Sequence, residues 1–211
     1  PYFLRISHDS PAARAGRGGT YLGARPPVSP PTPPQPADYN VQEFGAVGDG
    51  VTDDLPAIRA ALGQAAKADA GRIVFPPTDK FYLISDTINL RSDRTHLFGP
   101  GATIKLKASA GRMDAIRIGT YVPGVGSGPT SPVVEYVKVE GLTIDGNYRQ
   151  QPQKRQGNNP RGIWSGRAHH VLLKDLTLRD TFSGVTFGPG SRDCVAASVT
   201  VTDWDHDAFG A

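Results

Sequence analysis

The chain has 211 residues, of which 38% are hydrophobic, so it can bury one sizeable core but not the cores of two full domains. With 25 glycines, 19 prolines and a net charge of +3, the composition indicates a fold with many turns, a disordered arm, or both. The single cysteine, Cys194, excludes an internal disulfide; spaced Cys and His pairs of the zinc-binding kind are absent, and so is any apolar run long enough to span a bilayer.

The N-terminal part has the composition of an arm followed by a spacer. Residues 1–25 contain four arginines, one aspartate and few large apolar side chains, which predicts either an arm ordered only against a partner or a disordered tail. Residues 26–36, PPVSPPTPPQP, hold seven prolines in eleven positions and favour an extended polyproline helix, hence a semi-rigid linker over 26–38. Because the chain starts at Pro1 and stops abruptly at Ala211, we expect a removed start or a longer polypeptide.

Folded character begins at Tyr39, and a helix is predicted soon after it. Residues 52–54, TDD, offer N-caps to an apolar-periodic stretch from 55 to about 68. We expect Gly71 to end this helix before a short strand, RIVFPP. The apolar stripe of the helix consists of Ala57, Ile58, Ala61, Leu62 and Ala65.

From that strand to the end, the apolar pattern has period 2, falls into short strands and contains an internal repeat. A coil of roughly twenty-odd residues with apolar side chains in fixed positions cannot bury its core alone, whereas stacked coils bury a continuous one. The repeat therefore predicts a parallel β-helix, and it makes Cys194 a small core residue rather than a nucleophile. The repeating positions are Val137, Val139, Leu142 and Ile144, then Val171, Leu173, Leu176 and Leu178, then Cys194, Ala196, Val199 and Val201.

The string YNVQEFGAVGDGVTDDLPAIRAAL, followed by GRIVFPP, FYLIS, INL and LFGPGATIKL, resembles the start of the pectate-lyase-like right-handed β-helix superfamily. That group includes polygalacturonases, mannuronan epimerases, and tail spikes and minor tail proteins of bacteriophages. The resemblance covers residues 39–211 and implies an all-β, right-handed parallel β-helix whose first coil is capped by the helix. It also implies that Asp49, Asp53 and Asp54 are turn and capping residues rather than catalysts.

Two active-site patterns of that superfamily do not match this sequence. Mannuronan epimerases carry Asp-Pro-His-Glu after a Gly-hydrophobic-Phe corner, where this chain reads GPGS at 188–191. The polygalacturonase motifs Asn-Thr-Asp, Asp-Asp, Gly-His-Gly and Arg-Ile-Lys do not occur in that order, and DHD at 205–207 is only weakly similar to them. Epimerase chemistry is therefore not expected, and polygalacturonase-type motifs would have to lie in coils beyond Ala211.

The repeat alignment places two carboxylates, Asp180 and Asp203, in the same slot of neighbouring coils, about 5 Å apart at backbone level. Gly146 holds the preceding slot, with Asp145 beside it. The stacked carboxylates repel unless one is protonated or a cation or basic side chain lies between them. Three interpretations stay open: a glycosidase acid and base pair, a Ca²⁺ site supporting a lyase, or turn residues that accept backbone amides.

The same C-terminal stretch offers an imidazole and an indole. His206, aligned with Ser183, is a candidate general base or an exposed turn residue. Trp204, aligned with Thr181, is expected outside the core, where it would stack on a sugar or pack against another subunit.

Residues 148–168 form a predicted loop that carries cations and aromatic rings but no acid. Such a loop suits an anionic polysaccharide, since charges and sugar faces both find partners, and a solvated loop is the alternative. Nothing else in the chain resembles a nucleic-acid-binding fold. The loop cations are Arg149, Lys154, Arg155, Arg161 and Arg167. The predicted substrate-binding residues are Tyr148, Arg155, Arg161, Trp164 and Trp204.

Together, the pattern and the resemblance favour a domain that recognises, and in one interpretation depolymerises, a cell-surface or extracellular polysaccharide. The resemblance is strongest to phage tail spikes or minor tail proteins, which implies a homotrimer, an extracellular or virion location, and contacts with tail proteins through the arm. The alternatives are a secreted polysaccharide lyase or glycoside hydrolase with catalytic coils beyond Ala211, and a purely structural tail component. No cofactor is expected except Ca²⁺ for a lyase, and neither a nucleic-acid partner nor a membrane span is expected.

Overall fold

The structure is a computed structural model of the chain. The predicted arm, residues 1–25, and all but the last two residues of the predicted linker, 26–38, fall outside the residues that it describes. None of the helices that it describes is long and apolar enough to cross a membrane. The described residues are 37–111, 114–120, 132–152 and 161–210, except for the side chain of Asp207.

Short strands dominate the described residues, with a single α-helix near the start, as the sequence pattern predicted. The helical elements are the 3₁₀ helix η3 (Val41–Phe44), α1 (Leu55–Lys67) and the 3₁₀ helix η4 (Tyr148–Gln150). The strands are β1 (Asp38–Asn40), β2 (Gly71–Val74), β3 (Tyr82–Ile84), β4 (Ile88–Leu90), β5 (Thr95–Phe98), β6 (Thr103–Leu106), β7 (Ile116–Ile118), β8 (Val134–Glu135), β9 (Lys138–Glu140), β10 (Thr143–Asp145), β11 (Arg161–Ser165), β12 (Ala168–His169), β13 (Leu172–Phe187) and β14 (Val195–Gly210).

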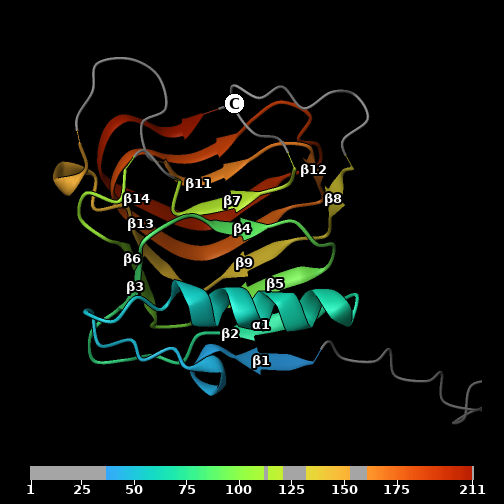
Figure 1. Ribbon diagram of the computed structural model, residues 1–211. Coiled ribbons are helices and arrows are strands. Elements are labelled where there is room, and N and C mark those ends of the chain that lie inside the picture. The colour runs from blue at the N-terminus through green and yellow to red at the C-terminus, as the bar shows by residue number, and fades with distance from the viewer. Residues whose placement is uncertain (1–36, 112–113, 121–131, 153–160, 211) are drawn as a thin grey trace, which may run out of the picture. The chain divides into compact units, whose positions relative to one another are not determined.

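The strands wind into coils that stack in parallel and form three faces (Figure 1). Parallel pairing joins β1, β2, β5 and β9 along the first face, β3, β6 and β10 along the second, and β4, β7 and β11 along the third. The long strands β13 and β14 turn through the corners and continue all three faces. The short strands β8 and β12 pair just before the first face. This arrangement is the predicted parallel β-helix.

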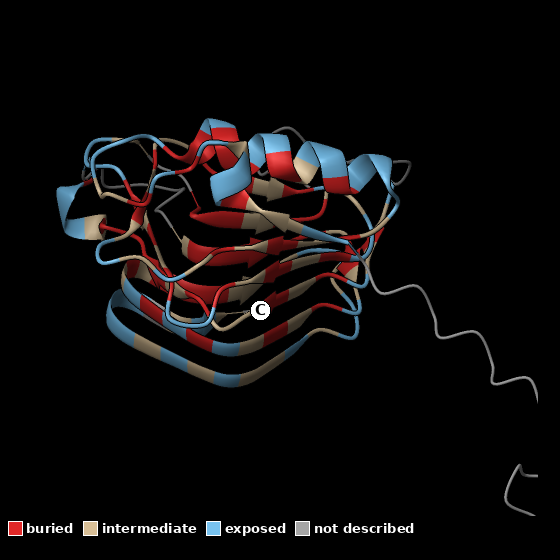
Figure 2. Ribbon diagram, turned by 90° about the horizontal axis from the view of Figure 1, so that it is seen from below, coloured by how far each residue is buried: buried red, intermediate tan, exposed pale blue. Residues whose placement is uncertain are grey.

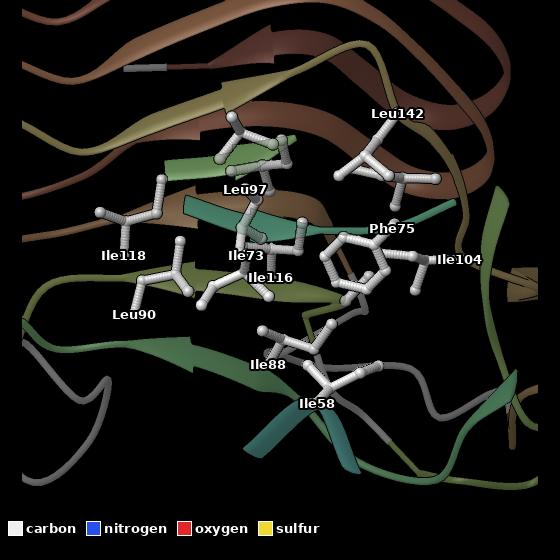
Figure 3. Packing of buried hydrophobic residues seen from close by; sticks show 14 of the residues in the cluster. Ile58, Ile73, Phe75, Ile88, Leu90, Leu97, Ile104, Ile116, Ile118 and Leu142 are labelled. Atoms are coloured by element: carbon white, nitrogen blue, oxygen red, sulfur yellow. The ribbon is translucent and has the colours of Figure 1, made fainter. Parts of the chain in front are cut away.

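Helix α1 packs against the first coil and covers its apolar end. Its buried residues lie on the side turned toward the strands (Figure 2), and Ile58 lies close to Ile88 in the core (Figure 3). The helix begins at Leu55 as predicted, but Gly71 does not end it. Gly71 is the first residue of β2, where an added Cβ would lie 2.4 Å from the Cβ of Ala65 on the helix. Only glycine therefore lets the strand approach the helix this closely.

The apolar repeat corresponds to columns of inward side chains that run along the axis of the coils. On the first face, Val139 pairs with Leu173, which in turn pairs with Ala196. On the second face, Ile144 is aligned with Leu178 in the next coil. Each fully buried aliphatic side chain contributes about 1.5–3 kcal/mol relative to an exposed one, so the columns supply the driving force for stacking. The register predicted from the repeat is confirmed at these positions.

Asp54 ties the start of α1 to the loop before it and to β3. Its carboxylate accepts hydrogen bonds from the backbone amides of Val47 (2.6 Å), Gly48 (3.2 Å) and Leu83 (3.2 Å). Its own amide donates to the carbonyl of Leu83 at 2.8 Å. The residue is 1% exposed, and burial raises the pKa of this carboxyl against the lowering effect of the three amides.

The expected turn and capping roles of the early aspartates are confirmed with one change. Asp49 accepts from the amides of Val51 and Thr52, and these hydrogen bonds lower its pKa. Asp53 accepts from the amide of Leu55 at 3.2 Å. Asp54 is the N-cap residue by position, but its side chain caps nothing in the helix and serves the loop and β3 instead.

Glu140 is the centre of a charge cluster on the outer side of the first face. Its carboxylate lies 2.5 Å from Nζ of Lys138 and 3.2 Å from Nζ of Lys174. The hydrogen bond from Lys138 lowers the pKa of Glu140 to about 2, with help from Lys174 and against partial burial. Nε2 of His96 lies 3.2 Å from the same carboxylate without the geometry of a hydrogen bond, and burial, then Lys138, lowers the pKa of His96.

Replacing Asp54 by Asn should lower the free energy of unfolding by about 2 kcal/mol or more. The side-chain NH₂ group of Asn cannot accept a hydrogen bond, so at least one buried backbone amide loses its acceptor. Urea unfolding of the variant measures this loss. Asp79→Asn, an exposed carboxylate in the same part of the chain, is the matched control and should stay near wild type. Equal stability of the two variants would show that the Asp54 hydrogen bonds do not hold the cap.

Glu140→Gln should give a pH-dependent loss of stability. The pKa of Glu140 is depressed from 4.5 to about 2, so its ionised form stabilises the fold at neutral pH, and this contribution disappears as pH falls through that interval. The difference in unfolding free energy between wild type and variant should therefore be largest near neutrality and shrink on acidification. Glu43→Gln, at an exposed position, serves as control. A difference that stays constant with pH would contradict the role of the cluster.

Candidate functional site

The two carboxylates expected to stack lie at the corner between the second and third faces. Pairing of Arg179 with Thr202 and of Thr181 with Trp204 puts Asp180 and Asp203 at equivalent positions of adjacent coils. Both adopt left-handed backbone conformations, with φ of 48° and 54°, as Asp tolerates at tight turns. The predicted slot is therefore confirmed, whereas catalysis by these residues stays a prediction.

Arg149 of η4 lies between the stacked carboxylates. Its Nη1 is 3.7 Å from Asp180 and its Nη2 is 3.5 Å from Asp203, and its backbone amide donates to Asp180 at 3.3 Å. The stacked acids thus have the basic side chain that their mutual repulsion requires. The Arg149 side chain is 65% exposed and the Asp203 side chain 57% exposed, so the ion pairs contribute at most about 1 kcal/mol to stability.

A ladder of aromatic rings lies beside this ion pair, with one ring from each of three coils. The Tyr148 ring lies 5.7 Å from that of Phe182, and Phe182 stacks on His206 at 4.9 Å with an interplanar angle of 29°. The Tyr148 hydroxyl donates to Asp205 at 3.0 Å and links the first coil of the ladder to the last. We call this site the Arg149 corner; it comprises Tyr148, Arg149, Asp180, Phe182, Asp203, Trp204, Asp205 and His206.

The register of the corner differs from the sequence alignment at one position. Thr181 pairs with Trp204 as expected, but Ser183 pairs with Asp207, because β14 carries one extra residue in a bulge. His206 is therefore not opposite Ser183; it lies in the bulge, where its ring reaches Phe182. Trp204 is 49% exposed, as predicted for a position outside the core.

The predicted cationic loop is partly a strand. Residues 161–165 form β11, paired with β7 and β13, and Trp164 is only 3% exposed, so its ring is not presented to a ligand. Arg161 lies 3.8 Å from the carboxylate of Asp114 and 5.9 Å from the Trp164 ring. Arg155 falls outside the described residues. The sequence showed no acid in this segment, but the fold supplies acids from other coils.

The packing of Trp164 also explains why this chain has glycine, and not an acid, at position 188, where the sequence comparison expected the acidic motif of epimerases. An added Cβ at Gly188 would lie 2.8 Å from Cζ2 of Trp164 and 2.9 Å from the carbonyl oxygen of Ser165. An acidic side chain does not fit there while the indole is in place. Farther along, the hydroxyls of Ser165 and Ser191 lie 2.9 Å apart.

Cys194 is confirmed as a small residue packed against the core. Pairing of Leu172 with Val195 places it opposite Val171, and burial raises the pKa of its thiol. A raised thiol pKa leaves little thiolate at neutral pH, which does not suit a nucleophile. Within the described ranges, no three His, Cys, Asp or Glu side chains are grouped to hold a metal ion, and the Ca²⁺ site stays a prediction.

The sequence of this chain is similar to those of proteins whose names indicate different roles. The chain is 30% identical over 164 residues to mannuronan C5-epimerase AlgE6 of Azotobacter vinelandii, which covers 72% of this chain. It is 31% identical over 166 residues, 73% of this chain, to the pre-neck appendage protein of Bacillus phage phi29. In each case the match spans only 17% of the relative's length.

Among solved structures, PfbA, a surface adhesin of Streptococcus pneumoniae, superposes with a TM-score of 0.61 at 22% identity over 80% of this chain and 39% of that one. This likeness concerns the fold alone. The family described as rhamnogalacturonase A/epimerase, pectate lyase-like, matches residues 39–147, more than half of the chain. With its capped, three-faced stack of parallel coils, the chain belongs to this pectate-lyase-like family.

Proposed function

We propose that this domain recognises a polysaccharide through the Arg149 corner. The observation that carries the proposal is the ring ladder of Tyr148, Phe182 and His206 next to the exposed indole of Trp204. Aromatic faces stack on sugar rings, and nearby carboxylates accept hydrogen bonds from sugar hydroxyls. Surface ion pairs add little to stability, so stability does not explain why these polar and aromatic groups gather at one corner.

The proposed setting is a virion or another extracellular location. One relative is named a pre-neck appendage protein of a phage, and a protein of similar fold is titled a surface adhesin. On this basis we propose a role like that of a tail spike or minor tail protein, as a homotrimer attached to other virion proteins through residues 1–25. A purely structural tail component, without sugar recognition, is the competing proposal.

Depolymerisation is the second candidate function, favoured by the alignment of two carboxylates on adjacent coils. In that case Asp180 and Asp203 would act as the acid and base of a hydrolase, or His206 as the base of a lyase. Arg149 counts against it, because its guanidinium, which can only donate, contacts both carboxylates that would have to act on the reacting bond.

Trp204→Ala should weaken polysaccharide binding about tenfold while leaving the fold intact, since the indole is half exposed and stacking on a sugar is its proposed role. Calorimetry with the full polypeptide would screen dextran, chitin and chitosan oligosaccharides, alginate and polygalacturonate, and compare the variant on whichever binds. Tyr136→Ala removes another exposed ring, one that stacks on His170 away from the corner, and should bind like wild type. Unchanged binding by Trp204→Ala would place recognition elsewhere.

Cleavage is tested on the same panel by following new reducing ends together with the absorbance of unsaturated uronates. Hydrolysis should produce reducing ends without that absorbance, and Asp180→Asn should slow it by about 100-fold or more, a larger loss than any weakening of binding measured on the same variant. Both products together would identify a lyase and call for a Ca²⁺ titration. Binding without either product would reject depolymerisation and leave recognition as the function.

A further inference from the structure

The carboxylates of the Arg149 corner outnumber its cation. Asp180, Asp203 and Asp205 bring three negative charges, and Arg149 brings the one guanidinium described in contact with them. Even a protonated His206 would leave a negative charge in excess. The aromatic rings make the corner a candidate site, and its carboxylates decide which ligands it accepts.

Two donor groups of the corner, the Arg149 guanidinium and the Tyr148 hydroxyl, face the corner's own carboxylates. Arg149 is directed at two carboxylates, and the Tyr148 hydroxyl donates to Asp205. Asp203 and Asp205 each have one described contact, whereas a carboxylate has about four lone-pair positions. The corner therefore offers free acceptor positions, for which a ligand has to bring the donors.

The neighbouring cations that the structure describes lie beside carboxylates outside the corner, two cations to each carboxylate. Lys105 and Arg179, on the adjoining second face, both lie close to Asp145, at 3.2 Å and 3.1 Å. Arg161 lies near the buried carboxylate of Asp114. The sequence suggested an anionic polysaccharide because its loop shows no acid, but two cations of that loop, Arg149 and Arg161, lie beside acids from other segments.

We infer that the Arg149 corner selects glycans that present hydroxyl or ammonium groups and discriminates against polyuronates. A sugar hydroxyl or ammonium group satisfies the free carboxylate positions, whereas a uronate would bring a further negative charge and no donor in its place. At surface distances of a few ångströms, such a charge changes affinity by a factor of about ten or more, and salt weakens the effect. This inference rests on the proposed recognition of polysaccharide by the same corner.

Two matched ligand pairs isolate the charge of the sugar from its shape. Oligogalacturonate and its methyl ester share one backbone but differ in the carboxylate, and chitosan and chitin oligosaccharides differ in the ammonium group. With the full polypeptide at low salt, the ester should bind about tenfold more tightly than the free acid, and chitosan more tightly than chitin. Both preferences should shrink as salt is added.

Asp203→Asn combined with Asp205→Asn should bring both ratios close to one. Asn suits the left-handed backbone at position 203 and still accepts the Tyr148 hydroxyl at 205, so the fold is retained. Asp193→Asn, which neutralises a 71% exposed carboxylate near His170, is the control and should preserve both ratios. Tighter binding of the free acid, or ratios that the double variant does not change, would overturn the charge selection while leaving sugar recognition intact. Absence of binding to any sugar of either panel would reject the proposed function and the selection together.

Discussion

A stack of parallel coils has an apolar cross-section at its first coil, and in this chain helix α1 covers it. The helix does not hold its position by apolar contact alone, since hydrophobic contact is non-directional. Asp54 fixes the position of the helix start, because its buried carboxylate accepts hydrogen bonds from three backbone amides in two segments, one before and one after the helix in the sequence. Such a carboxylate is costly to bury without partners, so the loop, the helix start and β3 are required to meet in one arrangement.

Once the first coil is fixed, parallel pairing transmits its register to every later coil. Arg149, Asp180 and Asp203 come from three successive coils, and each reaches the same corner because side chains one coil apart are stacked along the axis. The Arg149 corner therefore depends on the core columns beneath it. Thr181, directly under the corner, is fully buried, and its hydroxyl has no hydrogen-bond partner among the described residues, an energetic cost that the surrounding core has to offset.

The coil architecture and the pairing of Asp180 with Asp203 could be predicted from the sequence because the apolar positions repeat and a solenoid converts repeats into register. That the helix caps the first coil was implied by the resemblance to the pectate-lyase-like superfamily. The bulge at His206 could not be predicted, since one inserted residue leaves the apolar pattern before it unchanged. The burial of Trp164 was missed because its strand, RGIWS, is buried at four consecutive positions and does not show the period-2 alternation of a half-buried strand.

Contacts between side chains of different coils could not be predicted from the sequence either. The loop that carries Arg149 has no acid of its own, and only the folded chain shows that its acids are contributed 31 and 54 residues downstream, at Asp180 and Asp203. Phe182 had no distinguishing pattern either, although it joins the rings of Tyr148 and His206. Charge balance read along a sequence segment is therefore a poor guide to charge balance at a solenoid corner.

The close contact between Gly188 and the indole of Trp164 links two positions 24 residues apart in the sequence. A larger residue at 188 collides with the indole, whereas removal of the indole alone leaves a cavity beside the glycine. Neither single change gives a well-packed intermediate. In descent, these positions are expected to change as a pair, so a lineage that acquired an acid at this corner would have replaced its tryptophan as well.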